Sequence, residues 1–275
     1  MKKTLSVVLS IVIFACFLSV SPVMNARAAS AADITDNKNG TFTLKYDNSD
    51  NAKVVVQVVR DGSETKYNYY LSDGKVTEVI PLTDGNGDYS VWVCKNVSGS
   101  KYSVVATGAI TLKLDDSALV YKNSNIIVDY ETKDKAIAKA VSLTKGCKTQ
   151  TAIITTIYNY MVKNYAYDYG KVSTVQSTVG YIPSIATTYS KKMGICYDIA
   201  SLYAAMLRSK GVAAKVATGY CKTIDSLHAW NEVYDEDAKK WYIIDITSDI
   251  AYYAAGVKYS MKKSSKVYYA VMYYH

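Results

Sequence analysis

The sequence predicts two folded units, an all-β unit followed by an α+β unit. From Asp33 to about Val120, hydrophobic residues alternate with polar ones and turn pairs of the Asn-Gly and Asp-Gly type recur, which is typical of short antiparallel strands. After Val120 the apolar residues take a helical spacing, and alternating segments return only after Gly211. Composition agrees with a folded chain, because 49% of the 275 residues are hydrophobic and 20% are charged.

The N-terminal residues 1–28 have the pattern of a secretory signal peptide. Lys2 and Lys3 supply the positive start, residues 5–20 the apolar segment, and Ala26-Arg27-Ala28 a cleavage site. The uninterrupted apolar part is short for a membrane span, so no permanent membrane anchor is expected. We therefore expect cleavage near Ala28 and a secreted or cell-surface protein.

Residues 29–120 are expected to form an antiparallel β-sandwich. Gly and Asn in the turns adopt positive φ at little cost, which favours short strands joined by tight turns. The segment Gly87–Val93 resembles a late strand of immunoglobulin-like or fibronectin-like modules. The expected strands are 41–46, 53–60, 66–71, 76–82, 88–94, 102–107 and 110–114.

Residues 121–275 are expected to form the α+β unit. Helices come first and strands follow, with Gly146 separating the first two helices and Gly211 ending the third. The expected helices are 133–145, 149–164 and 197–210, and the expected strands are 214–220, 228–234, 240–246 and 266–274.

The composition excludes several classes of site. With only 2 His and 5 Cys, and with no C-x-x-C or H-E-x-x-H motif, no metal or cofactor is expected. The net charge of +8 reflects a basic excess in residues 121–275. No cluster of Arg and Lys with interleaved aromatics marks a nucleic-acid face, so a solvated lysine surface is favoured over a site for anionic polymers.

One cysteine stands where a reactive thiol is expected. Cys196 follows Gly194 and begins the helix 197–210, where the helix dipole and unpaired N–H groups stabilise a thiolate. His228 begins one predicted strand and Asp245 lies inside the next, so the two side chains can meet if these strands pair. Cysteine, histidine and aspartate then supply a nucleophile, a base and an orienting carboxylate.

Each of the three residues has rivals. For the base, the other histidine is His275, at the end of the chain, where disorder is expected. For the carboxylate, Asp249 and Glu232 are alternatives, but a carboxylate at 245 within an apolar run needs a partner. Asp198 is interpreted as a helix N-terminal charge and Asp225 as a loop residue. Cys221 is interpreted as structural, and at most one disulfide can form among Cys94, Cys147 and Cys221 if Cys196 is a working thiol.

Three motifs together resemble the bacterial branch of the transglutaminase-like superfamily. They are Gly194–Ala200, His228–Val233 and Trp241–Thr247, in the family's order of Cys, His and Asp, within a likeness that covers about residues 133–250. The resemblance implies a papain-like core and a catalytic triad of Cys196, His228 and Asp245.

The sequence departs from the animal enzymes in one respect. They have a tryptophan upstream of the cysteine that helps to hold the oxyanion, whereas tryptophan here occurs only at 92, 230 and 241. Tyr181 or Tyr189 could supply a hydroxyl instead, and Trp230 is a third candidate for oxyanion or substrate contact.

Together with the signal peptide, the resemblance implies an exported amide hydrolase or acyltransferase that works through a thioester on peptide, isopeptide or related amide bonds at the cell surface. Water is the default acceptor, so hydrolysis of a peptide or isopeptide bond is favoured over cross-linking. The expected substrate is a protein or peptide, with association with the cell wall as one option, and the oligomeric state stays open. The alternative is a surface binding or adhesion protein whose transglutaminase-like domain is catalytically inert.

Overall fold

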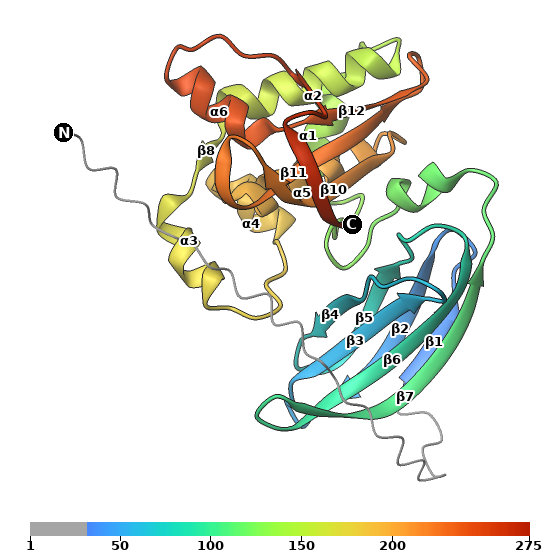
Figure 1. Ribbon diagram of the computed structural model, residues 1–275. Coiled ribbons are helices and arrows are strands. Elements are labelled where there is room, and N and C mark those ends of the chain that lie inside the picture. The colour runs from blue at the N-terminus through green and yellow to red at the C-terminus, as the bar shows by residue number, and fades with distance from the viewer. Residues whose placement is uncertain (1–31) are drawn as a thin grey trace. The chain divides into compact units, whose positions relative to one another are not determined.

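The computed structural model describes residues 32–275, so the predicted signal peptide lies outside the described residues (Figure 1). The described chain divides into two compact units, 32–130 and 131–275. The division falls after Tyr130, beyond the expected 120. The reason is that a 3₁₀ helix, Ser117–Lys122, and the residues after it are hydrogen-bonded to the β unit. For example, the Ile126 N–H donates to the Val79 carbonyl at 2.8 Å.

Among residues 32–275, no helix is both long and apolar enough to cross a membrane.

The first unit consists of two antiparallel sheets with the strand orders β1-β2-β5 and β4-β3-β6-β7. In Figure 1 the two sheets form two layers. They approach closely at Gly108 of β7, where a Cβ would lie 2.8 Å from the Ile34 Cδ1 of β1. The two-sheet architecture is therefore present, whereas its assignment to the immunoglobulin-like class stays a prediction. The strands are β1 Ala32–Asp36, β2 Thr41–Asn48, β3 Val54–Arg60, β4 Tyr67–Leu71, β5 Gly74–Pro81, β6 Gly87–Ser98 and β7 Lys101–Leu112.

Two details of this unit differ from the sequence prediction. Strand β1 was not predicted, and the predicted strands 102–107 and 110–114 form the single strand β7, because Gly108 keeps its place in the ladder opposite Val91. The turn before β2 depends on Gly40, whose φ is +88° and where a Cβ would collide with Val120.

The second unit is built on a five-stranded antiparallel sheet with the order β13-β12-β11-β10-β14. The buried helix α5 contacts β10 and β11, and α1, α2 and α4 contact α5. The Asn231 amide of β11 ties helix to sheet, since it donates to the Ala200 carbonyl of α5 at 3.0 Å and to the Lys215 carbonyl of β10 at 3.0 Å. The main elements are α1 Lys135–Thr144, α2 Gln150–Asn164, α5 Cys196–Arg208, β10 Ala214–Cys221, β11 Ile224–Asp235, β12 Lys240–Ile244 and β14 Tyr268–Tyr274.

Several short elements were not predicted. A parallel pair, β8 with β9, precedes α5, and three further helices join the larger elements. These elements are too short for an apolar pattern to predict them, because the helices span only about two turns and the strands only two residues. They are β8 Ala166–Tyr167, α3 Tyr169–Gln176, α4 Ile185–Lys191, β9 Met193–Gly194, α6 Ile246–Ala254 and β13 Lys262–Lys263.

Four local predictions were wrong. The strand expected over 240–246 ends at Ile244, because Asp245 accepts a hydrogen bond from the Ser248 N–H at 3.0 Å and so caps α6. His228 lies in the middle of β11 rather than at its start, and Asp225 belongs to the same strand rather than to a loop. The C-terminal His275 is ordered, since its backbone exchanges hydrogen bonds of 2.9 and 2.8 Å with Val216.

Candidate catalytic site

Cys196 is the first residue of α5 and is partly exposed. The approach to it is a tight corner: Lys192 ends α4 with a φ of +55°, and the two-residue strand β9 follows. Gly194 is required in this corner, because a Cβ there would lie 2.7 Å from the Cβ of Asp198. As the first helical residue, Cys196 has a backbone N–H with no carbonyl partner inside the helix.

Asp198 holds the first turn of α5 in place. Its carboxylate is completely buried and accepts a hydrogen bond from the Ile195 N–H at 3.0 Å. It also pairs with the Lys171 ammonium at 2.6 Å and accepts from the Tyr181 hydroxyl. The interpretation of Asp198 as a helix N-terminal charge therefore agrees with its position, and α3 supplies the cation that balances it.

His228 lies next to Asp245 at the end of β12. The distance between His228 Nε2 and Asp245 Oδ2 is 2.8 Å, and both side chains are buried. The two strands pair as expected, with Asn231 opposite Ile244. His228 itself lies opposite Gly219 of β10, a residue without a side chain.

Asp245 receives three donors on one oxygen. Besides His228, the Ser248 hydroxyl donates to Oδ2 at 2.6 Å and the Tyr268 hydroxyl at 2.7 Å. Burial works against the carboxylate, but the nearby His228 charge and the hydrogen bonds from His228 and Ser248 outweigh it and lower the pKa of Asp245 to about 2. Asp245 is therefore ionised at every pH near neutrality.

The charge of the imidazole depends on both of its neighbours. Burial disfavours the protonated ring, but the field and hydrogen bond of Asp245, together with a hydrogen bond to Cys196, raise the pKa of His228 well above its ordinary value. Because Nε2 faces Asp245, Nδ1 is the ring nitrogen left for Cys196. The structure thus brings Cys196, His228 and Asp245 together.

The rival residues lie in other interactions. The Asp249 carboxylate accepts a hydrogen bond from Tyr158 at 2.7 Å and pairs with Lys263, and Glu232 pairs with Lys215 at 2.9 Å. Cys221 is buried. All four cysteines in the described part of the chain are free.

The three oxyanion candidates differ in what holds them. The Tyr181 hydroxyl donates to Asp198 and accepts from Lys171 at 2.6 Å. The Tyr189 ring lies under the Lys192 ammonium, 3.6 Å from the ring centroid. Trp230 is 1% exposed and packs between His228 and Tyr268, with ring centroids 6.3 and 5.1 Å away.

Tyr167 is a neighbour of the thiol that sequence reasoning missed. It lies opposite Gly194 in the parallel pair of β8 and β9, and neighbours in such a pair point their side chains to the same side. The Cβ direction of Gly194 points at Asp198, so Tyr167 also faces the first turn of α5. Burial, followed by the field of Cys196, raises the pKa of Tyr167. Among the side chains that the structure describes, none is hydrogen-bonded to its hydroxyl. The position of Tyr167 near the thiol depends on the two-residue pairing of β8 with β9, which is too short for a sequence pattern to predict.

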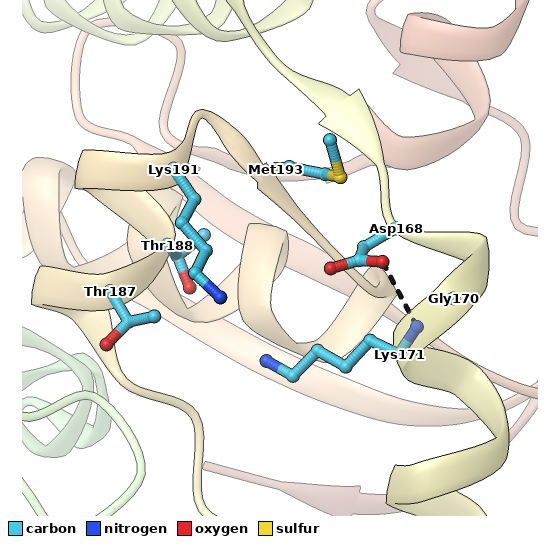
Figure 2. A pocket seen from close by; sticks show the side chains of 7 residues that line it. All are labelled: Asp168, Gly170, Lys171, Thr187, Thr188, Lys191 and Met193. Carbon is cyan, nitrogen blue, oxygen red and sulfur yellow. Dashed lines mark hydrogen bonds between the residues drawn. The ribbon is translucent and has the colours of Figure 1, made fainter.

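A pocket of about 320 Å³ lies beside β9 (Figure 2). Figure 2 shows Lys171 and Lys191 reaching into it from α3 and α4, with the Asp168 carboxylate bonded to the Lys171 N–H and Met193 at its edge. One residue that lines the pocket, Met193, comes three residues before Cys196. The ammonium groups of Lys171 and Lys191 give the pocket two positive charges. No group of three or more His, Cys, Asp or Glu side chains among the described residues is arranged to hold a metal ion.

One family model matches part of the chain. Residues 137–246 match the transglutaminase-like superfamily. No curated protein sequence matches the chain.

Three solved structures are similar over much of the chain. A candidate cysteine protease from Cytophaga hutchinsonii is 16% identical, with 79% of this chain and 69% of that chain covered and a TM-score of 0.41. A candidate protease from Parabacteroides distasonis is 13% identical (70% and 41% covered, TM-score 0.32), and the red sea bream transglutaminase is 12% identical (76% and 48%, TM-score 0.31). The chain spans less than half the length of the last two.

Proposed function

We propose that the chain is a cysteine-dependent amide hydrolase or acyltransferase with Cys196, His228 and Asp245 as its triad, since residues 137–246 match the transglutaminase-like superfamily. The observation that carries the proposal is the arrangement around His228. Its Nε2 lies 2.8 Å from a carboxylate that stays ionised, and its other nitrogen is left for a thiol at a helix N-terminus.

The first half of the reaction uses the imidazolium as an acid. The Cys196 thiolate attacks the amide carbonyl carbon, and the carbonyl electron pair moves to oxygen. Collapse of this intermediate expels the amine, which takes the Nδ1 proton of His228 and leaves a thioester on Cys196. Asp245 keeps the ring oriented throughout.

The oxyanion needs donors that are in place before the reaction. The Cys196 N–H is one, because the helix leaves it unpaired. As the second donor we propose the Tyr167 hydroxyl. Tyr181 is not chosen because its hydroxyl already donates to Asp198.

The second half of the reaction decides the product. Neutral His228 removes a proton from water, and the hydroxide attacks the thioester to release an acid and the thiol. An amine acceptor gives an amide by the same path. We favour hydrolysis, since Cys196 is partly exposed and water therefore reaches the thioester.

The test is the reactivity of the thiol together with turnover. Iodoacetamide is expected to label Cys196 faster than Cys147, which is also partly exposed but lacks a histidine partner among the described contacts, and Cys196→Ala is expected to abolish cleavage of a peptide-amide library. Cys147→Ala is the matched control and should keep full activity. Equal labelling of the two thiols, or activity that survives Cys196→Ala, would contradict the proposal.

We also propose that the protein acts outside the cytoplasm, as the sequence of residues 1–28 predicts, and that its substrate is a protein or peptide. Mass spectrometry of protein from the culture medium and cell surface checks this. A mature chain beginning near Ala29 supports export, and a chain that keeps residues 1–28 refutes it.

A further inference from the structure

The C-terminal strand β14 reaches the candidate triad through one side chain. Tyr268 is 7% exposed, and its hydroxyl donates to Asp245 Oδ2 at 2.7 Å, the same oxygen that faces His228 Nε2 at 2.8 Å. Tyr268 lies beyond residues 137–246, so it is no part of the segment that matches the superfamily.

Packing fixes the tyrosine in this position. Its ring lies 5.1 Å from the Trp230 ring, which in turn lies beside His228. Its backbone is paired with Cys221 across β10 and β14, and the buried cluster around it contains Ala217, Cys221 and Trp230. The hydroxyl is therefore aimed at Asp245 by the sheet.

The charge of Asp245 is shared among its donors. A hydrogen bond from a neutral hydroxyl stabilises the carboxylate and draws negative charge away from the bond to His228. Each such donor makes Asp245 a weaker partner for the imidazolium. The number of donors on Oδ2 thus sets how firmly the ring keeps its proton.

We propose that Tyr268 is a positioning residue that tunes the base: its hydroxyl holds Asp245 and moderates the pull of that carboxylate on His228. Ser248 acts on the same oxygen from α6 at 2.6 Å. The inference rests on the proposed function, because it concerns the protonation of the residue assigned as acid and base.

Cys196, Cys221 and Asp249 are other ionisable groups near this pair. Cys196 faces the imidazole from α5, and Cys221 of β10 lies near Tyr268. Asp249 of α6 lies near Asp245, but its charge is balanced by Lys263. These groups stay unchanged when only the Tyr268 hydroxyl is altered.

Because the sequence has only two histidines, the protonation of His228 can be measured directly. Protein labelled with ¹³C in the histidine rings gives signals only from His228 and His275, and burial with the field of Arg208 lowers the pKa of His275 to about 3. The titration of the other signal then reports His228 without any substrate. In Tyr268→Phe we expect the His228 midpoint to rise by about half a pH unit, because Asp245 loses a donor.

A second substitution has the opposite sign. Site-specific 3-fluorotyrosine at 268 keeps the ring and strengthens the hydroxyl as a donor, so the His228 midpoint should fall. The control is Tyr274→Phe on the same strand, whose hydroxyl bonds Glu232 at 3.0 Å, and it should leave the midpoint unchanged.

The possible outcomes separate the two proposals. Midpoints that do not move with either change at 268 overturn the role of Tyr268, and the fluorinated variant decides the matter if Tyr268→Phe fails to fold. If Cys196→Ala leaves the His228 midpoint of the wild-type chain unaltered, the thiol and imidazole do not interact, and the proposed function fails instead.

Discussion

At the scale of single residues, two glycines, Gly194 and Gly219, lie next to the reactive groups of the site. Gly194 has no Cβ, and this lets Asp198 pack against the chain and fix the start of α5. Gly219, the residue opposite His228 on β10, also has no side chain. Replacing Gly194 is therefore expected to shift the start of α5, and with it the thiol, although Gly194 takes no part in the chemistry.

Tyr167→Phe separates oxyanion stabilisation from thiolate formation. Losing one oxyanion donor is expected to lower kcat by about 10²-fold. Alkylation by iodoacetamide develops no oxyanion, so its rate should stay the same. Measuring kcat and alkylation rate on the same protein checks both expectations.

The control for this prediction is Tyr169→Phe, because Tyr169 packs against Tyr167 with ring centroids 4.8 Å apart but is 78% exposed. It should change neither rate. If Tyr167→Phe keeps wild-type kcat, or if it slows alkylation as much as turnover, the hydroxyl has no oxyanion role.

At the scale of elements, two contacts in the first turns fix the position of α5. Asn231 of β11 holds its Ala200 carbonyl, and the buried Asp198 links it to α3 through Lys171. The sequence predicted α5 and its neighbours β10 and β11 because their patterns are long. It missed α3 and α4, which supply the partners of Asp198 and the pocket wall, because short elements take their shape from caps and contacts.

Lys171→Met tests the link between α3 and α5. Removing the ammonium leaves the buried Asp198 charge without its cation, and the free energy of unfolding should fall by about 2 kcal/mol, less than for a fully buried pair because Lys171 is 27% exposed. Urea unfolding measures the change.

Lys191→Met is the matched control, since Lys191 lines the same pocket and is exposed. It should cost little. Combining Lys171→Met with Asp198→Asn should recover part of the loss, because the unpaired charge is then gone; a double variant as unstable as the sum of the singles would show that the two residues do not interact.

At the scale of the whole molecule, the Asp245–His228 pair couples folding to pH. The pKa of Asp245 is about 2 in the folded protein and 3.8 as its ordinary value, so between these pH values the unfolded chain binds more protons. Stability should therefore fall as pH drops from about 4 to about 2. His228 has the opposite sign, because its raised pKa adds stability below its ordinary range that is lost as pH rises through the folded value.

Denaturant unfolding across this acid range checks the first effect. Asp245→Asn should flatten the slope between about pH 4 and about pH 2, whereas Asp225→Asn, which removes an exposed carboxylate from β11, should not. Equal slopes in the wild type and Asp245→Asn would mean that Asp245 is not held as a buried carboxylate.

The sequence by itself determined the order of the long helices and strands, and it singled out Cys196, His228 and Asp245 as the proposed triad. It could do so because periodicity and a cysteine at a helix start are local properties. It placed Asp245 inside a strand, since the β-branched residues around it match a strand pattern. In the structure the Asp245 carboxylate accepts a hydrogen bond from the Ser248 N–H and caps a helix there.

Only the tertiary structure decided which groups surround the three residues. Tyr268, Lys171 and Tyr167 reach the site from elements that are distant in sequence or only two residues long, and no local pattern encodes such pairings. The physical reason is that a buried charge takes whichever donors the packed elements bring to it. Because Asp198 and Asp245 are buried, their charges require hydrogen-bonding or charged partners, and the packing of the elements determines which residues these are.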